Sequence, residues 1–388
     1  MSGTRKINFL VYKTEPLMWL IKRITWMTPI KLGLIFFLIA LSLHIVAAIY
    51  RYISPLELKR SFLLNTSWSI AIVYLYPFII GLTLKYYLEI PKLYNHIIKN
   101  IFKIENADSE ESKEIYEKLN CAYNNWLICP LSILATIVLN YVYVIQTLNS
   151  HPVDWMNKGE IWKDILHTDS GLSVPGFCAI IIQIILVYWV INLLVRGCIF
   201  AWSMHYLFNK KHIQIKLDPM HHDSCCGLKR IGEVSMILNV MLFLFGIYIS
   251  LKVVDKAVIQ SKSLLSDIGN PVMLITFTIL APVLFFFPLG AAHSIMKRTK
   301  DEFLEKVTAK IKIITKKLED VSGDKERFEC IQTINETVKY LDSMKKNIFV
   351  WPFNFKSLEA FFVTILVPLL PILIPLILYL FKIKLPKI

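Results

Sequence analysis

The sequence predicts an all-α protein that crosses a membrane about seven times, and three observations predict this class. Hydrophobic residues make up 55% of the 388 residues and charged residues only 19%, which excludes an ordinary soluble domain. Seven strongly apolar stretches run through the chain, and most reach the ~20 residues with which a helix crosses a hydrocarbon core of about 30 Å. Between them, Lys and Arg fall in alternating rich and poor connections, as expected of loops on two sides of a membrane.

Each apolar stretch is expected to be a helix, because lipid offers no hydrogen-bond partner to backbone groups left open. The fourth stretch is 33 residues long. It is expected either to project from the membrane as one helix or to bend near Arg196 and Gly197. In chain order, the predicted spans are Leu32–Tyr50, Trp68–Leu88, Trp126–Gln146, Gly176–Phe208, Ile231–Val254, Pro271–Ile295 and Leu358–Phe381.

The distribution of Lys and Arg predicts a plasma (inner) membrane protein with a cytoplasmic N-terminus and an outer C-terminus. Of 43 such residues, 30 fall on the side of the N-terminal segment and 10 on the other, and cytoplasmic loops carry the excess. No signal peptide is expected, because the first apolar run begins only at Leu32 and lacks a small-residue cleavage site. The segment Val11–Met27 mixes Trp and Leu with Lys and Arg, which predicts a helix along the membrane surface. A cytosolic extension of the first span is the alternative.

These features divide the chain into an interfacial segment (1–30), six spans (31–295), a cytosolic helical hairpin (296–357) and a last span with a short tail (358–388). The net charge of +14 is assigned to the bias between loops and to anionic lipid heads. The cysteines number seven and are scattered, which disfavours a disulfide framework.

The hairpin is predicted from two apolar stripes at helical spacing, separated by the turn Ser322-Gly323-Asp324. On the first helix, Lys306, Lys310 and Lys317 fall within one narrow stripe at about 100° per residue. They are candidate contacts for an anionic ligand such as a nucleotide or oligonucleotide. A solvated face, or one that touches lipid heads, is the alternative. The apolar residues are Phe303, Val307, Ile311, Ile314 and Leu318 on the first helix, and Phe328, Ile331, Ile334, Val338 and Leu341 on the second.

The stretch from Asp218 to Leu228 concentrates side chains that can bind ligands. Three interpretations remain open: a zinc site, a structured turn held by aspartate caps and Gly227, or a ligand or gating contact. Zinc sites usually take pairs of ligands from two places, and no second pair is evident, so no metal or cofactor is expected. The candidate residues are His221, His222, Asp223, Cys225 and Cys226.

This stretch resembles the P-x-H-P-D-x-x-G-G-L loop of uncharacterised bacterial multi-pass membrane proteins. Pro219, His221, Asp223, Gly227 and Leu228 match it. His222 replaces the second proline of that pattern and Cys226 its first glycine, and Trp351-Pro352-Phe353-Asn354 resembles the end of the same family. The match covers about fifteen residues and implies no activity.

The layout as a whole also resembles, in outline, Hailong-type bacterial antiphage membrane effectors, and in topology the insect odorant-receptor channels. The first resemblance implies a cytosolic anionic signal. No residue motif accompanies either resemblance.

Few polar side chains lie in the interior of the predicted spans, and none of these is a carboxylate. Arg196 is the only permanently charged group well inside a span; a place at the membrane interface is favoured over a deep one that faces a cavity or partner. Each proline in a span removes a backbone donor and frees a carbonyl one turn earlier, which is typical of kinked packing helices and of gating helices. The pore or gate candidates are Pro282 and Pro288 in the sixth span and Thr364, Pro368, Pro371 and Pro375 in the last.

The function that these features favour is a homo-oligomeric channel or pore-forming effector, gated by a cytosolic signal. No Walker loop, G-x-G-x-x-G, H-E-x-x-H or G-x-S-x-G motif occurs, so no enzyme is expected. The alternatives are a secondary transporter, for which no inverted repeat is evident, and an enzyme acting on lipid or phosphoester through His221 and Asp223. The ligand-binding candidates are Lys306, Lys310, Lys317, Arg196, His221, His222 and Asp223.

Overall fold

The computed structural model describes residues 15, 18, 23–24, 26–53, 70–102, 110–150, 174–209, 215, 217–219, 221, 223–254, 269–320, 323–352, 359 and 362–363. All regular structure in these residues is helical, as predicted, and they contain no strand. The elements are α2 (Pro29–Ile53), the π-turn η2 (Ala71–Leu75), α4 (Tyr76–His96), the π-turn η3 (Ile97–Ile101), α5 (Glu110–Tyr123), α6 (Ile128–Ser150), α8 (Val174–Phe208), α9 (Lys229–Val254), α10 (Gly269–Asp320) and α11 (Asp324–Asn347).

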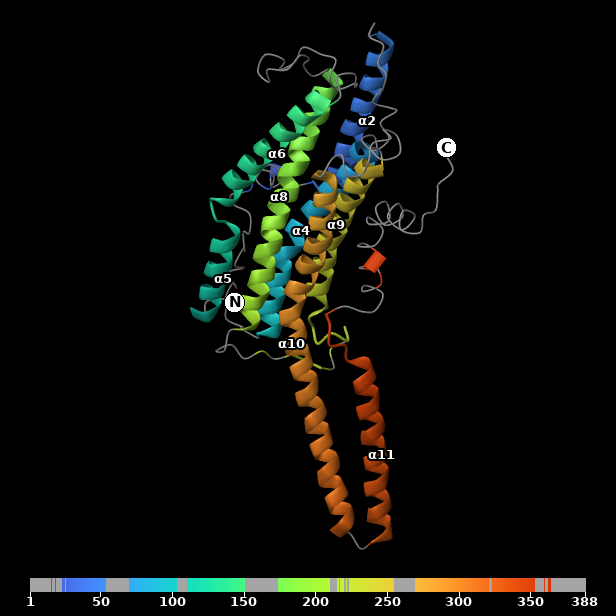
Figure 1. Cartoon of the computed structure of the whole chain (residues 1–388). Helices are drawn as coiled ribbons and strands as arrows, with labels where there is room; N and C mark the ends of the chain where they lie inside the picture. The colour runs from blue at the N-terminus through green and yellow to red at the C-terminus, as the bar shows by residue number, and fades with distance from the viewer. Residues whose placement is uncertain are drawn as a thin grey trace, which may run out of the picture.

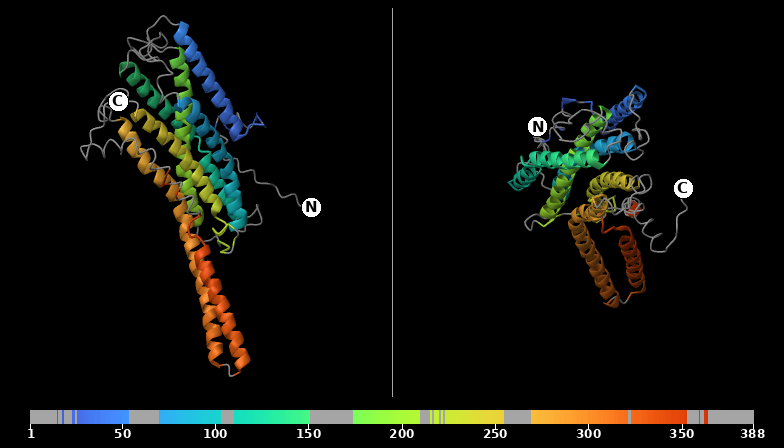
Figure 2. Two further views of the ribbon diagram at one scale, coloured as in Figure 1. Left: turned by 90° about the vertical axis from the view of Figure 1, so that its right-hand side faces the viewer. Right: turned by 45° about the horizontal axis from the view of Figure 1, so that its top comes forward.

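The long helices form one elongated bundle, from which a two-helix hairpin extends at one end (Figures 1 and 2). Helix α4 lies inside the bundle and packs against α2, α8 and α9. Its aromatic side chains form much of the core, with Tyr86, Tyr87 and Tyr94 fully buried. The end where α4 and α8 finish and α9 begins is the end from which the hairpin extends, and we call it the hairpin end (Figure 1).

Two glycines allow α2 and α4 to cross closely. A Cβ added at Gly81 would lie 2.8 Å from the carbonyl oxygen of Pro29, and one added at Gly33 would lie 3.0 Å from that of Pro77. A methyl group would collide with backbone at Gly81 and would be crowded against backbone at Gly33. Small residues that bring two backbones together are a common basis of helix association in membranes, where the hydrophobic effect does not drive it.

Five helical segments of the described residues are long and apolar enough to cross a membrane: Pro29–Val46, Ala71–Ile101, Lys113–Tyr141, Phe177–Phe208 and Lys229–Tyr248. They correspond to the first five predicted spans. Helix α8, which contains the 33-residue stretch, is one continuous helix of 35 residues. Much of the sixth span and nearly all of the seventh lie outside the residues whose side chains are described, so the count of seven stays a prediction.

Helix α10 continues without interruption through the predicted boundary at residues 295 and 296 and is 52 residues long. At 1.5 Å per residue it extends about 78 Å, more than twice the thickness of a hydrocarbon core. Pro282 and Pro288 lie inside it. The turn predicted around Gly323 is confirmed, because α10 ends at Asp320 and α11 begins at Asp324.

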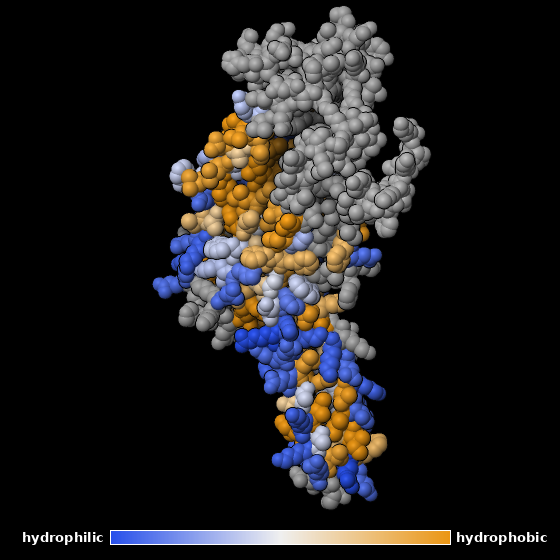
Figure 3. All heavy atoms as spheres, in the orientation of Figure 1, coloured by the Kyte–Doolittle hydropathy of each residue, from blue (hydrophilic) through white to orange (hydrophobic). Residues whose placement is uncertain are grey.

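The polarity of the surface also changes along the long axis of the molecule, from the bundle to the hairpin. On the face seen in Figure 3, apolar residues predominate on the upper described part of the bundle, and hydrophilic residues become dense toward the hairpin end. Large apolar side chains of α6 such as Leu131, Leu134 and Ile137 are about 60% exposed, as lipid-facing residues are. The chain therefore has the surface of a membrane protein.

Candidate functional site

The described residues between Asp218 and Leu228 form a tight turn between α8 and α9 at the hairpin end. Two of its non-glycine residues have positive φ, Ser224 at 56° and Cys226 at 54°, and Gly227 follows at 87°. Left-handed backbone disfavours side chains with a Cβ, so the surrounding structure must hold this conformation in place.

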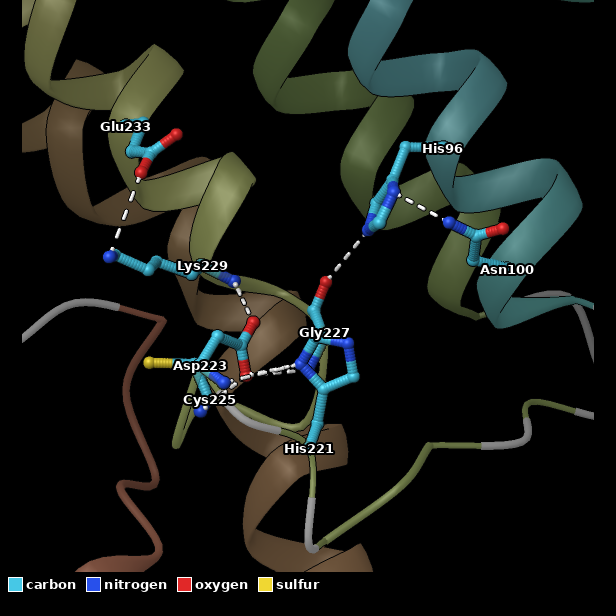
Figure 4. Close-up of polar contacts among 8 residues, drawn as sticks. All are labelled: His96, Asn100, His221, Asp223, Cys225, Gly227, Lys229 and Glu233. Atoms are coloured by element: carbon cyan, nitrogen blue, oxygen red, sulfur yellow. Dashed lines mark hydrogen bonds and ion pairs between the residues drawn. The ribbon is translucent and has the colours of Figure 1, made fainter.

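The carboxylate of Asp223 organises the turn (Figure 4). One oxygen accepts hydrogen bonds from the backbone N–H groups of Cys225 at 2.8 Å and Gly227 at 3.0 Å, and the other accepts one from Lys229, the first residue of α9, at 3.4 Å. His221 Nδ1 lies 2.9 Å from the first oxygen. The aspartate thus holds the turn and caps a helix N-terminus.

The charged form of Asp223 is the favoured one. Burial alone would raise the pKa of its carboxyl group, but the hydrogen bonds from the N–H groups of Gly227 and Cys225 and from His221 outweigh burial and hold the pKa below its usual value. The turn therefore contains a fixed negative charge, with its side chain only 10% exposed.

A histidine of α4 holds the turn from the other side. Asn100 Nδ2 donates to His96 Nδ1 at 2.8 Å, so the hydrogen of the imidazole lies on Nε2, which donates to the carbonyl of Gly227 at 3.1 Å (Figure 4). Asn100 belongs to the π-turn η3, and such turns often re-aim side chains at functional positions. The sequence contained no sign of this contact, because His96 and Gly227 are 131 residues apart.

The two cysteines of the turn are buried, each only 2% exposed. Burial, and after it the neighbouring negative charge of Asp223, raises the pKa of Cys225 to about 12 and that of Cys226 to about 11, so both are neutral thiols near pH 7. Among the described residues, no three His, Cys, Asp or Glu side chains are placed to share a metal ion, and His222 lies outside them. The hydrogen bonds of Asp223 and His96 are those expected of a structured turn.

The turn also contacts the segment that follows α11. Phe349 N–H donates to the carbonyl of Ser224 at 3.1 Å. From α10, His293 Nδ1 bonds the carbonyl of Val350 at 2.7 Å, and its ring stacks on Trp351 with centroids 4.1 Å apart. The turn, α10 and residues 348–352 therefore meet at one junction, which includes the Trp351-Pro352 pair named in the sequence.

Arg196 is a second buried polar centre. Its guanidinium donates to Asn192 Oδ1 at 2.6 Å and to the carbonyl of Tyr123 at 2.9 Å, where α5 ends. It also lies 5.5 Å from the ring centroid of Tyr87 and 3.8 Å from Glu15. Asn192 and Tyr87 are themselves hydrogen-bonded, at 3.3 Å, so the cation sits in a continuous polar network.

Arg196 is therefore a buried group, only 1% exposed, with a carboxylate as its ion-pair partner. Glu15 was not among the predicted site residues, because it lies ahead of the first apolar stretch. Glu15 is fully buried and its other oxygen lies 3.4 Å from the hydroxyl of Tyr188. The helix predicted over Val11–Met27 lies largely outside the described residues.

The predicted lysines lie far from both centres, on the free part of α10, and Lys306, Lys310 and Lys317 are exposed. Pro282 is half-buried and Pro288 buried in the bundle part of α10, where His205 of α8 bonds the carbonyl of Phe287 at 2.8 Å. Thr364, Pro368, Pro371 and Pro375 lie outside the described residues.

The fold, the lipid-like surface and the polar hairpin end together define the class, a polytopic α-helical membrane protein. No family model, curated protein or solved structure matches the chain.

Proposed function

We propose that the chain is a subunit of a homo-oligomeric membrane channel that opens in response to a signal received at the hairpin, which we place in the cytoplasm. One observation carries this proposal: α10 is a single helix that belongs to the apolar bundle at one end and to the charged hairpin at the other. A continuous helix transmits a tilt or rotation along its length. A ligand on the hairpin can therefore move the membrane part of α10.

The contacts of α10 support this coupling at two levels. In the bundle, Leu284, Phe285 and Leu289 are buried near the two internal prolines, which weaken the helix locally and make it easier to bend. At the hairpin end, Lys300 Nζ donates to the carbonyls of Lys345 and Ile348, both at 2.8 Å, and so ties α10 to the end of α11. The segment that follows leads toward the predicted last span.

The signal that we propose is an anion, such as a nucleotide or oligonucleotide. The supporting feature is the exposed stripe of Lys306, Lys310 and Lys317, which lies within reach of a polyphosphate or several linked phosphates. The outline resemblance to antiphage effectors makes bacterial defence the biological context that we propose.

The test of channel function is ion flux through purified protein in liposomes and conductance in planar bilayers. Reversal of the stripe, Lys306→Glu with Lys310→Glu and Lys317→Glu, is expected to change the open probability. The matched control is Lys312→Glu with Lys316→Glu, because both lysines are exposed but lie on another face of the same helix. Absence of any conductance from folded, oligomeric protein would contradict the proposal. Saturable uptake of one solute without conductance would instead indicate a transporter.

The role of helix continuity has its own test at Arg298, an exposed residue of α10 between the bundle and the hairpin. Arg298→Pro breaks the helix there at a cost of about 3 kcal/mol, whereas Arg298→Ala leaves it intact. We expect Arg298→Pro channels to conduct but to respond no longer to reversal of the lysine stripe. If the stripe acts equally in both backgrounds, α10 does not carry the signal.

A further inference from the structure

The hairpin exposes apolar side chains although it extends away from the apolar bundle. On α11, Phe328 is 68% exposed, Ile331 47% and Val338 39%, and on α10 Ile313 is 60% exposed. Figure 3 shows apolar residues exposed on the hairpin between hydrophilic ones. Of the five apolar residues predicted to share one face of α11, only Ile334 and Leu341 lie toward α10, and the other three are exposed.

The exposed residues form two strips of different chemistry. At about 100° per residue, Ile313 falls on the same face of α10 as Lys306, Lys310 and Lys317, and we call these four residues the basic strip. On α11, the two aspartates Asp324 and Asp342 fall on the face of the exposed apolar residues. We call this set the acidic strip, and it comprises Asp324, Phe328, Ile331, Val338 and Asp342.

The two strips lie on opposite flat sides of the hairpin. Seen from the bundle, the basic strip is rotated by about 100° counter-clockwise from the side of α10 that faces α11. The acidic strip is rotated by about 130° in the same sense from the side of α11 that faces α10. Because the two helices face each other from opposite directions, the same sense of rotation brings the strips to opposite sides. Within one hairpin they do not meet.

The strips also match in height. The rings of Phe303 and Tyr340 meet at 6.5 Å and set the antiparallel register. From that contact, Ile313 lies about 15 Å and Ile331 about 13.5 Å toward the tip, at 1.5 Å per residue. By the same count, Lys317 lies at about 21 Å and Asp324 at about 24 Å.

We infer that hairpins of neighbouring copies pack head to tail, with the basic strip of one copy against the acidic strip of the next. Rotation about an axis normal to the membrane keeps every residue at its height, so Ile313 of one copy meets Ile331 of the next, and Lys317 comes within reach of Asp324. This inference rests on the proposed function, because it requires a homo-oligomer, and it specifies which surfaces of neighbouring copies meet. An anion that binds the basic strip would compete with the aspartates of the neighbouring copy.

The experiment is disulfide trapping between two differently tagged full-length chains, co-expressed and reconstituted together. One chain has Ile313→Cys and the other Ile331→Cys, both in a Cys330→Ser background so that the adjacent native thiol does not react. A disulfide requires Cβ atoms about 4 Å apart, so a product containing both tags reports a direct contact between copies. The control pair is Lys312→Cys with Ile331→Cys, because Lys312 is exposed on a different face.

We expect the 313–331 pair to give several-fold more two-tag product than the control pair. Lys317→Glu in the chain with Ile313→Cys should lower that yield about two- to five-fold, as for one exposed ion pair, and Asp324→Lys in the chain with Ile331→Cys should restore it. Equal yields from both pairs, or mainly 313–313 products, would overturn the head-to-tail contact. Conductance without the 313–331 product rejects this contact alone, whereas the product without conductance rejects the channel and leaves the contact in place.

Discussion

The substitution Asp223→Asn tests whether one carboxylate holds the turn between α8 and α9. Asparagine has almost the same shape but no charge. Its oxygen can still accept from the N–H groups of Cys225 and Gly227, but its NH₂ group replaces the oxygen that accepts from Lys229 N–H. The variant therefore keeps weaker hydrogen bonds from Cys225 and Gly227. Its side-chain NH₂ group, a donor, then faces the N–H group of Lys229, which is also a donor.

The size of the effect follows from these bonds. A hydrogen bond to a charged group contributes about 1.5–3 kcal/mol and a neutral one about 0.5–1.5 kcal/mol, so the two weakened bonds cost about 2–3 kcal/mol. The bond from Lys229 N–H is long, at 3.4 Å, and its loss adds up to about 1 kcal/mol, which gives a total of about 2–4 kcal/mol. Unfolding entropy of about 2.1 cal/mol/K per residue gives about 0.8 kcal/mol/K for this chain. The expected fall in melting temperature is therefore about 2.5–5 °C.

The assay is thermal unfolding of detergent-solubilised protein, followed by tryptophan fluorescence as a function of pH. The folded state holds the pKa of Asp223 below its ordinary 3.8, so its contribution is complete above that pH and is lost as the pH falls through the folded pKa. The gap between wild type and Asp223→Asn should be constant from about pH 7 to 5 and should narrow below about pH 4.

The control is Glu233→Gln, which removes an exposed charge 4.0 Å from Lys229 and should change stability by no more than about 0.5 kcal/mol. Equal melting temperatures for wild type and Asp223→Asn near pH 7 would refute the role given to the carboxylate. A gap that persists unchanged at pH 3 would refute its electrostatic origin.

Two further predictions concern packing and the thiols. Gly81→Val should separate α2 from α4 and destabilise the protein by about 1–3 kcal/mol or more, whereas Gly290→Ala, which meets no atom within 4 Å, should be neutral or slightly stabilising in the same melting assay. A soluble maleimide at pH 7 should modify the exposed Cys121 but leave Cys225 and Cys226 unmodified until the protein unfolds, because both are buried and neutral. Rapid labelling of either thiol in folded protein would contradict the packing of the turn.

The sequence was sufficient for those features that depend on local chemistry. An uninterrupted apolar run in lipid has no alternative to helix, so the positions of the first five spans follow from composition alone. The hairpin and its turn follow from a 3.6-residue period on either side of Gly323. The structured-turn interpretation of residues 218–228 also has a local basis, because Asp223 bonds N–H groups no more than six residues away.

Other features depend on groups that are distant in the chain, and no local pattern encodes them. The burial of Arg196 depends on Glu15, and the turn depends on His96 of α4 as well as on Asp223. Which apolar residues of the hairpin remain exposed depends on how α11 rotates against α10. Local propensity would end a helix near Pro282 or Pro288, but α10 continues through both because tertiary contacts outweigh the loss of single hydrogen bonds. Only the folded chain could show that one helix joins the membrane bundle to the hairpin.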